Sequence, residues 1–173
     1  LRTRRQRQMC IRDREPGRYL VGNAGVLLTR VLGTKVGEKK QFVIVDAAMN
    51  DLIRPALYDA YHMVVPVELE AARTADVRTV DVVGPVCESG DFIAHGREMP
   101  AVKTGDLLAV LSAGAYGAVM SGTYNTRPEP PEVLVRGDQF AVTRPRRTVA
   151  DLIAAERLPP WICLLYTSDA ADE

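Results

Sequence analysis

The feature that most constrains the fold is a series of short β-branched and apolar runs, separated by turns in which glycine stands beside a charged residue. Runs of this length and composition are typical of antiparallel strands joined as hairpins. The runs that we expect to form strands are 26–35, 41–46, 62–67, 77–86, 107–111, 132–135 and 139–142. We therefore predict a mainly β fold, an antiparallel β-barrel or sandwich from Val26 to Val142, with short helices near Asn50–Ala60 and Thr148–Arg157.

Both expected helices begin with a capping signal. Asn50 or Asp51 can cap the first helix, and Pro55 is tolerated only in a first turn or in a distorted one. Thr148, with Asp151 three residues on, has the form of a capping box at the start of the second helix.

Composition excludes several classes of protein. Lysine plus arginine equals aspartate plus glutamate, 22 of each, so the overall charge does not indicate nucleic-acid or membrane binding. The three cysteines, Cys10, Cys87 and Cys163, show no metal-ligand or disulfide spacing, which favours a reducing compartment. No apolar run reaches the roughly 18 residues of a membrane span, and no signal peptide is apparent, so we expect a cytoplasmic protein.

The two ends of the chain differ from the rest. Residues 1–14 are rich in arginine and could pass for a nucleic-acid-binding arm, yet both they and residues 161–173 resemble translated cloning sequence. We interpret both as non-native tails that are disordered or loosely attached, and residues 26–160 as a β domain. Because the chain opens with Leu1 rather than methionine, we expect a fragment.

Cys87 to Asp91, the sequence CESGD, is the segment most suggestive of chemistry. Apolar runs flank it, which indicates a strand that ends in a tight loop and presents Cys87 and Glu88 at the sheet rim. A free thiol has a pKa near 8.5, and an adjacent carboxylate disfavours the thiolate, so this thiol suits a proton donor better than a nucleophile. The alternative is a small buried cysteine beside a solvated glutamate.

Three other segments carry groups that can bind a ligand. Glycine and arginine in Gly17-Arg18 can form an anion clamp, although a simple turn explains them equally well. Arg54 and Tyr58 share one face if helical, and can hold an anionic substrate group or form a solvated face. Small residues around Tyr116 allow close approach of a ligand or partner chain.

The order of four motifs resembles the C-terminal portion of the diaminopimelate decarboxylase family, which belongs to the alanine-racemase-like decarboxylases dependent on pyridoxal phosphate. The resemblance covers about residues 15–160. The motifs are Glu15–Arg18 (EPGR), Asp51–Ala60 (DLIRPALYDA), Cys87–Asp91 (CESGD), and Gly114–Tyr116 followed by Tyr124–Asn125.

The resemblance implies a role for each matching residue. Cofactor-binding residues would be Glu15, Pro16, Gly17, Arg18 and Tyr116, with Gly17 at the phosphate of pyridoxal 5'-phosphate. Substrate-binding residues would be Arg18, Arg54, Tyr58, Glu88 and Tyr116, and the catalytic proton donor would be Cys87. In this family Cys87, Glu88 and Tyr116 would come from the partner subunit, so the resemblance implies a homodimer with shared active sites.

One part of the family pattern has no counterpart. The family's cofactor lysine lies in an N-terminal (β/α)8 barrel of about 250 residues, for which this chain has no room. None of Lys35, Lys39, Lys40 and Lys103 matches that lysine. We therefore expect a C-terminal fragment, inactive alone, in which residues 15–25 form the end of the missing barrel domain.

The expected activity of the intact protein is the decarboxylation of meso-diaminopimelate to L-lysine, a step of lysine biosynthesis. Within the family, the alternatives are decarboxylases of ornithine, arginine or carboxynorspermidine. The alternative outside it is a non-catalytic β-barrel binding module in which Cys87 is only a buried side chain.

Overall fold

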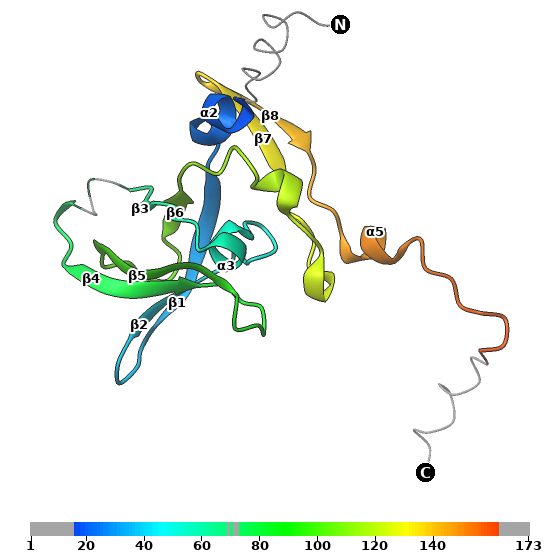
Figure 1. Cartoon of the computed structure of the whole chain (residues 1–173), viewed down its shortest axis with the longest axis horizontal. Helices are drawn as coiled ribbons and strands as arrows, with labels where there is room; N and C mark the ends of the chain where they lie inside the picture. Colours follow the sequence, from blue (N-terminus) through cyan, green and yellow to red (C-terminus); the bar gives the residue numbers. More distant parts are fainter. Residues whose placement is uncertain (1–15, 69, 71–72, 163–173) are drawn as a thin grey trace, which may run out of the picture. The chain divides into compact units, whose positions relative to one another are not determined.

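The computed structural model describes residues 16–68, 70 and 73–162, and most of its regular secondary structure is strand (Figure 1). The chain divides into two compact units, Leu1–Asn125 and Thr126–Glu173, and the division falls within the range 26–160 that the sequence predicts as one domain. The predicted tails lie outside the described residues, except for 161 and 162. In chain order the elements are α2 (Gly17–Val21), η1 (Gly22–Ala24), β1 (Leu27–Val36), β2 (Gln41–Val45), α3 (Arg54–Tyr58), β3 (Val64–Pro66), β4 (Val77–Val83), β5 (Phe92–Pro100), β6 (Leu107–Val110), η2 (Ala118–Met120), η3 (Tyr124–Thr126), β7 (Glu132–Arg136), β8 (Gln139–Arg144) and α5 (Val149–Ile153).

The first unit is built on a six-stranded sheet in the order β3-β6-β1-β2-β4-β5. Its two end strands, β3 and β5, lie near each other, so the sheet curls into a nearly closed barrel. Pairing is antiparallel, as predicted, except between β2 and β4, which run parallel. A parallel pair needs a long crossover connection, and residues 46–76, which include α3 and β3, provide it.

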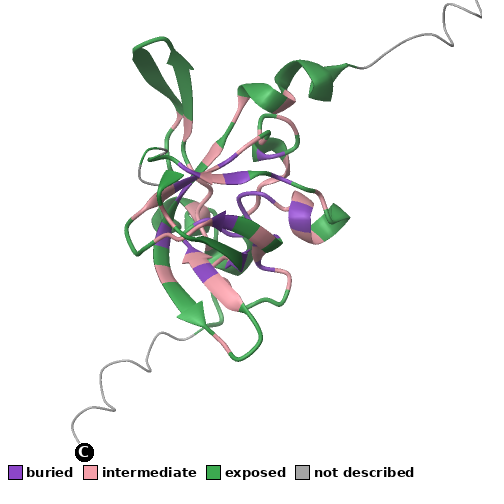
Figure 2. Ribbon diagram, turned by 90° about the vertical axis from the view of Figure 1, so that its left-hand side faces the viewer, coloured by how far each residue is buried: buried purple, intermediate pink, exposed green. Residues whose placement is uncertain are grey.

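Buried positions alternate with more exposed ones along much of β1 and β2 (Figure 2), and the apolar side chains at the buried positions of the strands form the core of the barrel. The fully buried members of this core include Val31, Val45, Val82, Ile93, Leu108 and Val110. Burying a side chain of this size contributes about 1.5 to 3 kcal/mol. The predicted strands are present. However, β4 ends at Val83, so residues 84–86, which were predicted as strand, belong to the loop that follows, and β5 extends further than the short apolar run after the CESGD loop indicated.

The first predicted helix is present as α3, but its capping residue differs from the prediction. The N-cap is Ile53, without a side-chain hydrogen bond, and Pro55 lies in the first turn as expected. The side chains of Asn50 and Asp51 bind elsewhere: Asp51 accepts the amide N–H of Ala48, and Asn50 donates to two carbonyls of a later loop. Local sequence shows that such a side chain seeks a backbone partner, but not which partner it meets in the folded chain.

The second unit pairs β7 with β8 and ends in α5. The predicted capping box is confirmed: the Thr148 hydroxyl accepts the Asp151 amide at 3.1 Å, and the Asp151 carboxylate accepts the Thr148 amide at 2.7 Å. These Thr148 bonds hold the pKa of Asp151 below its ordinary value. Across the described part of the chain, no helix is long and apolar enough to cross a membrane.

Candidate active site

Cys87 and Glu88 lie in an exposed loop, residues 84–91, that joins β4 to β5. Two backbone hydrogen bonds close the loop. Gly84 N–H donates to the Asp91 carbonyl at 3.0 Å, and Asp91 N–H donates to the Glu88 carbonyl at 3.0 Å. The predicted loop at the end of a strand is confirmed. The alternative of a buried cysteine is wrong, since Cys87 is exposed.

A buried carboxylate anchors this loop. The Asp91 side chain, in a residue only 5% exposed, accepts the Val86 N–H at 2.5 Å and the Met49 N–H at 2.7 Å. The sequence predicts only that Asp91 lies in a turn. Its position directly before the apolar run of β5 was the one available signal that its side chain would be buried.

Helix α3 brings Arg54 and Tyr58 together, as the four-residue spacing predicts. The guanidinium carbon of Arg54 lies 5.8 Å from the centre of the Tyr58 ring and 5.6 Å from that of Tyr116. Tyr58 is 60% exposed and Tyr116 47%, so both rings remain open to a ligand. The arrangement combines one cation with two aromatic faces, which suits a carboxylate or a planar ring.

The small residues before Tyr116 allow a close backbone approach by the chain's own residues 21–25. Ala113 N–H bonds to the Gly25 carbonyl at 2.9 Å, and Gly114 N–H to the Gly22 carbonyl at 3.0 Å. A Cβ added at Gly114 would lie 2.7 Å from the Gly25 nitrogen. This contact joins the end of η1, and through it α2, to the loop that carries Tyr116.

Tyr116 itself has a left-handed backbone, with φ of 57°. Ser112 and Asn125 share this rare conformation, with φ of 58° for each. Such strain costs about 1 to 3 kcal/mol per residue and clusters at functional sites, where the surrounding structure enforces it. Ser112 opens the loop that carries Tyr116, and Asn125 belongs to the fourth motif.

The fourth motif reaches the CESGD loop through Tyr124. The Tyr124 hydroxyl donates to Glu88 Oε2 at 3.4 Å. The Asn50 side-chain amide donates to the carbonyls of Gly122 and Tyr124 at 3.1 and 2.9 Å. Asn50, one of the two residues predicted as a possible helix cap, therefore ties the fourth motif to the segment before α3.

The first motif is described only in part. Glu15 lies outside the described residues, Pro16 occupies the N-cap position of α2, and Gly17 and Arg18 are exposed on that helix. Among the described residues, no atom outside α2 and the chain neighbours of Gly17 lies within 4 Å of the position that a Cβ there would take.

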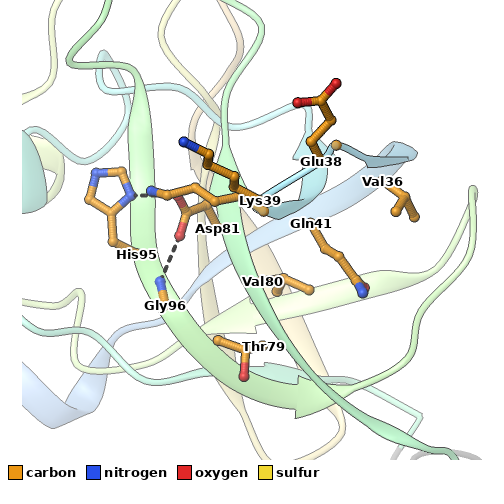
Figure 3. Close-up of a pocket in the computed structure, with 11 residues that line it drawn as sticks. Val36, Glu38, Lys39, Gln41, Thr79, Val80, Asp81, His95 and Gly96 are labelled. Atoms are coloured by element: carbon orange, nitrogen blue, oxygen red, sulfur yellow. Dashed lines mark hydrogen bonds and ion pairs between the residues drawn. The ribbon is translucent and has the colours of Figure 1, made fainter.

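A separate cleft of about 560 Å³ lies between the β1–β2 turn and strands β4 and β5 (Figure 3). There Asp81 accepts hydrogen bonds from Lys40 at 2.7 Å and Gly96 N–H at 2.7 Å, and His95 Nδ1 lies 3.2 Å from it. Burial raises the pKa of Asp81, but the three neighbours outweigh burial and hold the pKa below its ordinary value. None of the predicted site residues lines this cleft.

Residues 18–114 match the family described as pyridoxal-dependent decarboxylase, C-terminal sheet domain, and the chain belongs to this family. It is 60% identical over 148 residues to a diaminopimelate decarboxylase of Pseudomonas fluorescens, covering 84% of this chain and 34% of the relative. It is 50% identical over 149 residues to that of Zymomonas mobilis, covering 86% and 34%. The chain thus spans about a third of the length of the curated relatives it matches.

Solved structures agree with this assignment. A diaminopimelate decarboxylase of M. jannaschii in co-complex with L-lysine matches with a TM-score of 0.76 and 39% identity, covering 83% of this chain and 32% of that one. AQ1208 from Aquifex aeolicus matches with a TM-score of 0.76 and 47% identity, covering 79% and 33%. An arginine decarboxylase of Paramecium bursaria Chlorella virus shares the fold alone, with 20% identity and a TM-score of 0.58.

Proposed function

We propose that the protein containing this chain is a decarboxylase that uses pyridoxal 5'-phosphate to convert meso-diaminopimelate to L-lysine in lysine biosynthesis. The observation that carries the proposal is one folded unit that holds an exposed thiol beside a carboxylate and a guanidinium within 6 Å of the centres of two tyrosine rings. Identities of 50% to 60% to diaminopimelate decarboxylases support the choice of substrate.

The residues of this chain fit part of a pyridoxal phosphate site. The Tyr116 ring is half-exposed beside a cation, and Gly17 is exposed. We assign cofactor contacts to Tyr116 and to residues 15–18, with Gly17 at the phosphate. When bound, the cofactor would supply a sink for the electrons that remain after carbon dioxide leaves.

The cofactor lysine is assigned to the rest of the protein. Of the chain's four lysines, Lys40 is engaged by Asp81 at 2.7 Å, Lys35 lies in β1, and Lys39 and Lys103 lie in turns of the barrel. None of these positions matches the family's cofactor lysine.

The substrate groups are assigned by charge. Arg54, with Tyr58, pairs with the distal carboxylate of diaminopimelate, Arg18 with a carboxylate, and Glu88 with an ammonium group. A distal carboxylate is what separates diaminopimelate from ornithine and arginine, whose distal groups are cationic and would be repelled by Arg54. Cys87 Sγ donates its proton to the carbon that has lost the carboxylate, and becomes a thiolate.

We further propose a cytoplasmic homodimer with shared active sites, in which the loop of Cys87 and Glu88 serves the partner's site. The family resemblance groups Tyr116 with this loop. Arg54 lies 5.6 Å from the Tyr116 ring of the same chain, which supports assigning these two residues of one subunit to the same active site. Both subunits would then be needed to complete one site.

Activity of the complete protein tests the proposal. With pyridoxal phosphate present, meso-diaminopimelate should yield carbon dioxide and L-lysine, and ornithine and arginine should react far more slowly. Arg54→Met should raise KM for diaminopimelate and lower the ratio of kcat/KM for diaminopimelate to kcat/KM for ornithine. Preference for ornithine in the unaltered protein, or no lysine at all, would refute the assignment.

A further inference from the structure

We propose that Asp91 is a positioning residue for the proposed reaction: its buried carboxylate fixes the loop of Cys87 and Glu88 to the segment that precedes α3. This inference rests on the proposed function, because it assigns Asp91 a part in placing the proton donor. Asp91 itself touches neither substrate nor cofactor in this assignment.

The first support is the way in which one carboxylate joins two segments. Its Oδ2 accepts the N–H of Val86, next to the thiol residue, at 2.5 Å. Its Oδ1 accepts the N–H of Met49, 42 residues earlier, at 2.7 Å. Charge-assisted bonds of this kind are about twice as strong as neutral ones. The loop also lies beside α3, since a Cβ added at Gly90 would lie 3.8 Å from the Cβ of Ala56.

The second support is the space left for that carboxylate. A Cβ added at Gly84 would lie 2.7 Å from the Cγ of Asp91 and closer still to its oxygens. Glycine at this position therefore leaves room for the carboxylate beside the backbone of the loop. Two different substitutions, Asp91→Asn and Gly84→Ala, thus disturb the same interaction from opposite sides.

Asparagine at position 91 keeps the size but not the acceptors. A carboxylate has two acceptor oxygens, whereas an amide has one oxygen and one NH2 group. In Asp91→Asn the NH2 group would face either Val86 N–H or Met49 N–H, and that bond is lost. The loop would then move relative to α3, and Cys87 with it, whichever subunit's site the loop serves.

The experiment uses the complete protein with two readouts. One is kcat, KM and the cofactor Kd; the other is the rate at which iodoacetamide alkylates Cys87, followed by mass spectrometry of its peptide. Displacement of a reacting group by about 1 Å can cost about 100-fold, so we expect kcat to fall about 10- to 100-fold in both variants. The cofactor Kd should stay unchanged, because its proposed contacts lie elsewhere, and alkylation of Cys87 should become faster as the loop loosens.

Asp106→Asn is the matched control. The Asp106 carboxylate also accepts a backbone N–H, that of Lys103 at 2.9 Å, but within its own turn. This variant should leave kcat and the alkylation rate unchanged.

Two results would overturn the inference. One is an unchanged kcat and alkylation rate in both Asp91→Asn and Gly84→Ala. The other is a fall of kcat and cofactor affinity together, in proportion to the folded fraction, which would mean that Asp91 only supports the fold. If the unaltered protein does not act on diaminopimelate, the proposed function fails, and the alkylation rates still decide whether Asp91 positions Cys87.

Discussion

Cys87 shows how far a single residue can be interpreted from sequence. Its neighbours identified a loop and a possible proton donor, and the structure confirms that the residue is exposed in that loop. What holds the residue in place, the Asp91 carboxylate bonded to Met49 N–H, comes from far along the chain. A chemical role at residue scale therefore depends on a partner that no local pattern names.

Replacing Cys87 tests its proposed role in the complete protein. General acid catalysis supplies about 100- to 10,000-fold, so Cys87→Ala should lower kcat within that range and leave the cofactor Kd nearly unchanged. Cys87→Ser should be almost as damaging, because a hydroxyl is a far weaker acid than a thiol. Steady-state kinetics check both variants. Full activity in Cys87→Ala would remove the cysteine from the mechanism.

Glu88 should behave differently from its neighbour. If Glu88 binds a substrate ammonium group, Glu88→Gln should mainly raise KM, since the neutral amide loses the charge attraction but can still accept a hydrogen bond. Tyr124→Phe, which removes the 3.4 Å bond to Glu88, is the companion variant and should raise KM less. A pure loss of kcat in Glu88→Gln would instead indicate a part in proton transfer.

The lowered pKa of Asp81 leads us to expect that the free energy of unfolding depends on pH. Its folded-state pKa is lowered, so the carboxylate stabilises the fold fully above the unfolded-state pKa near 3.9, and this stabilisation is lost as pH falls through the folded-state pKa. At pH 7, Asp81→Asn should cost about 1 to 3 kcal/mol, the worth of a hydrogen bond to a charged group. Urea denaturation at pH 7 and pH 3 measures the difference between variant and wild type. A difference as large at pH 3 as at pH 7 would contradict the assignment.

At the scale of elements, the contact between η1 and the loop of Tyr116 leaves no room for an added side chain. Gly25 and Gly114 meet backbone to backbone, and a Cβ at Gly25 would lie 2.6 Å from the Gly114 Cα. Because neither residue has a side chain, the backbone after η1 and the loop before Tyr116 can lie in direct contact. Without that contact, η1, and α2 before it, would lose their attachment to the loop that carries Tyr116.

Gly114→Ala should therefore destabilise the barrel. A Cβ there would overlap backbone atoms that cannot rotate away, and overpacking of this kind costs about 1 to 3 kcal/mol. Gly33→Ala in β1 is the matched control, because no atom of the described residues, apart from its chain neighbours, lies within 4 Å of its added Cβ. Urea denaturation of the chain measures both. Equal stability of the two variants would show that the backbone contact yields easily.

At the scale of the whole molecule, the chain provides one part of the proposed catalytic apparatus. The residues proposed as proton donor, as substrate-binding arginines and as an aromatic contact to the cofactor all lie in this chain, whereas the cofactor lysine is proposed to lie in the rest of the protein. Since the chain spans about a third of its curated relatives, the proposed reaction needs groups from the rest of the protein.

Mixing two inactive variants of the complete protein tests the shared site. One variant carries Cys87→Ala and the other lacks the cofactor lysine. In a symmetric dimer with shared sites, each mixed dimer has one intact site, so an equal mixture should recover about a quarter of wild-type activity. Activity no greater than the sum of the separate variants would place the thiol and the lysine in the same subunit.

Local patterns in the sequence determined the strands, their turns, the cap of α5 and the four motifs, because strand propensity, turn chemistry and capping act over a few residues. Only the tertiary structure decided the parallel pairing of β2 with β4, the partners of Asn50 and Asp91, and the contact of Arg54 with Tyr116. These contacts join residues far apart in the chain. They form because closure of the barrel brings together loops whose local sequences do not indicate which other loop they will contact. The sequence thus names the groups of the candidate site, and closure of the barrel sets their distances.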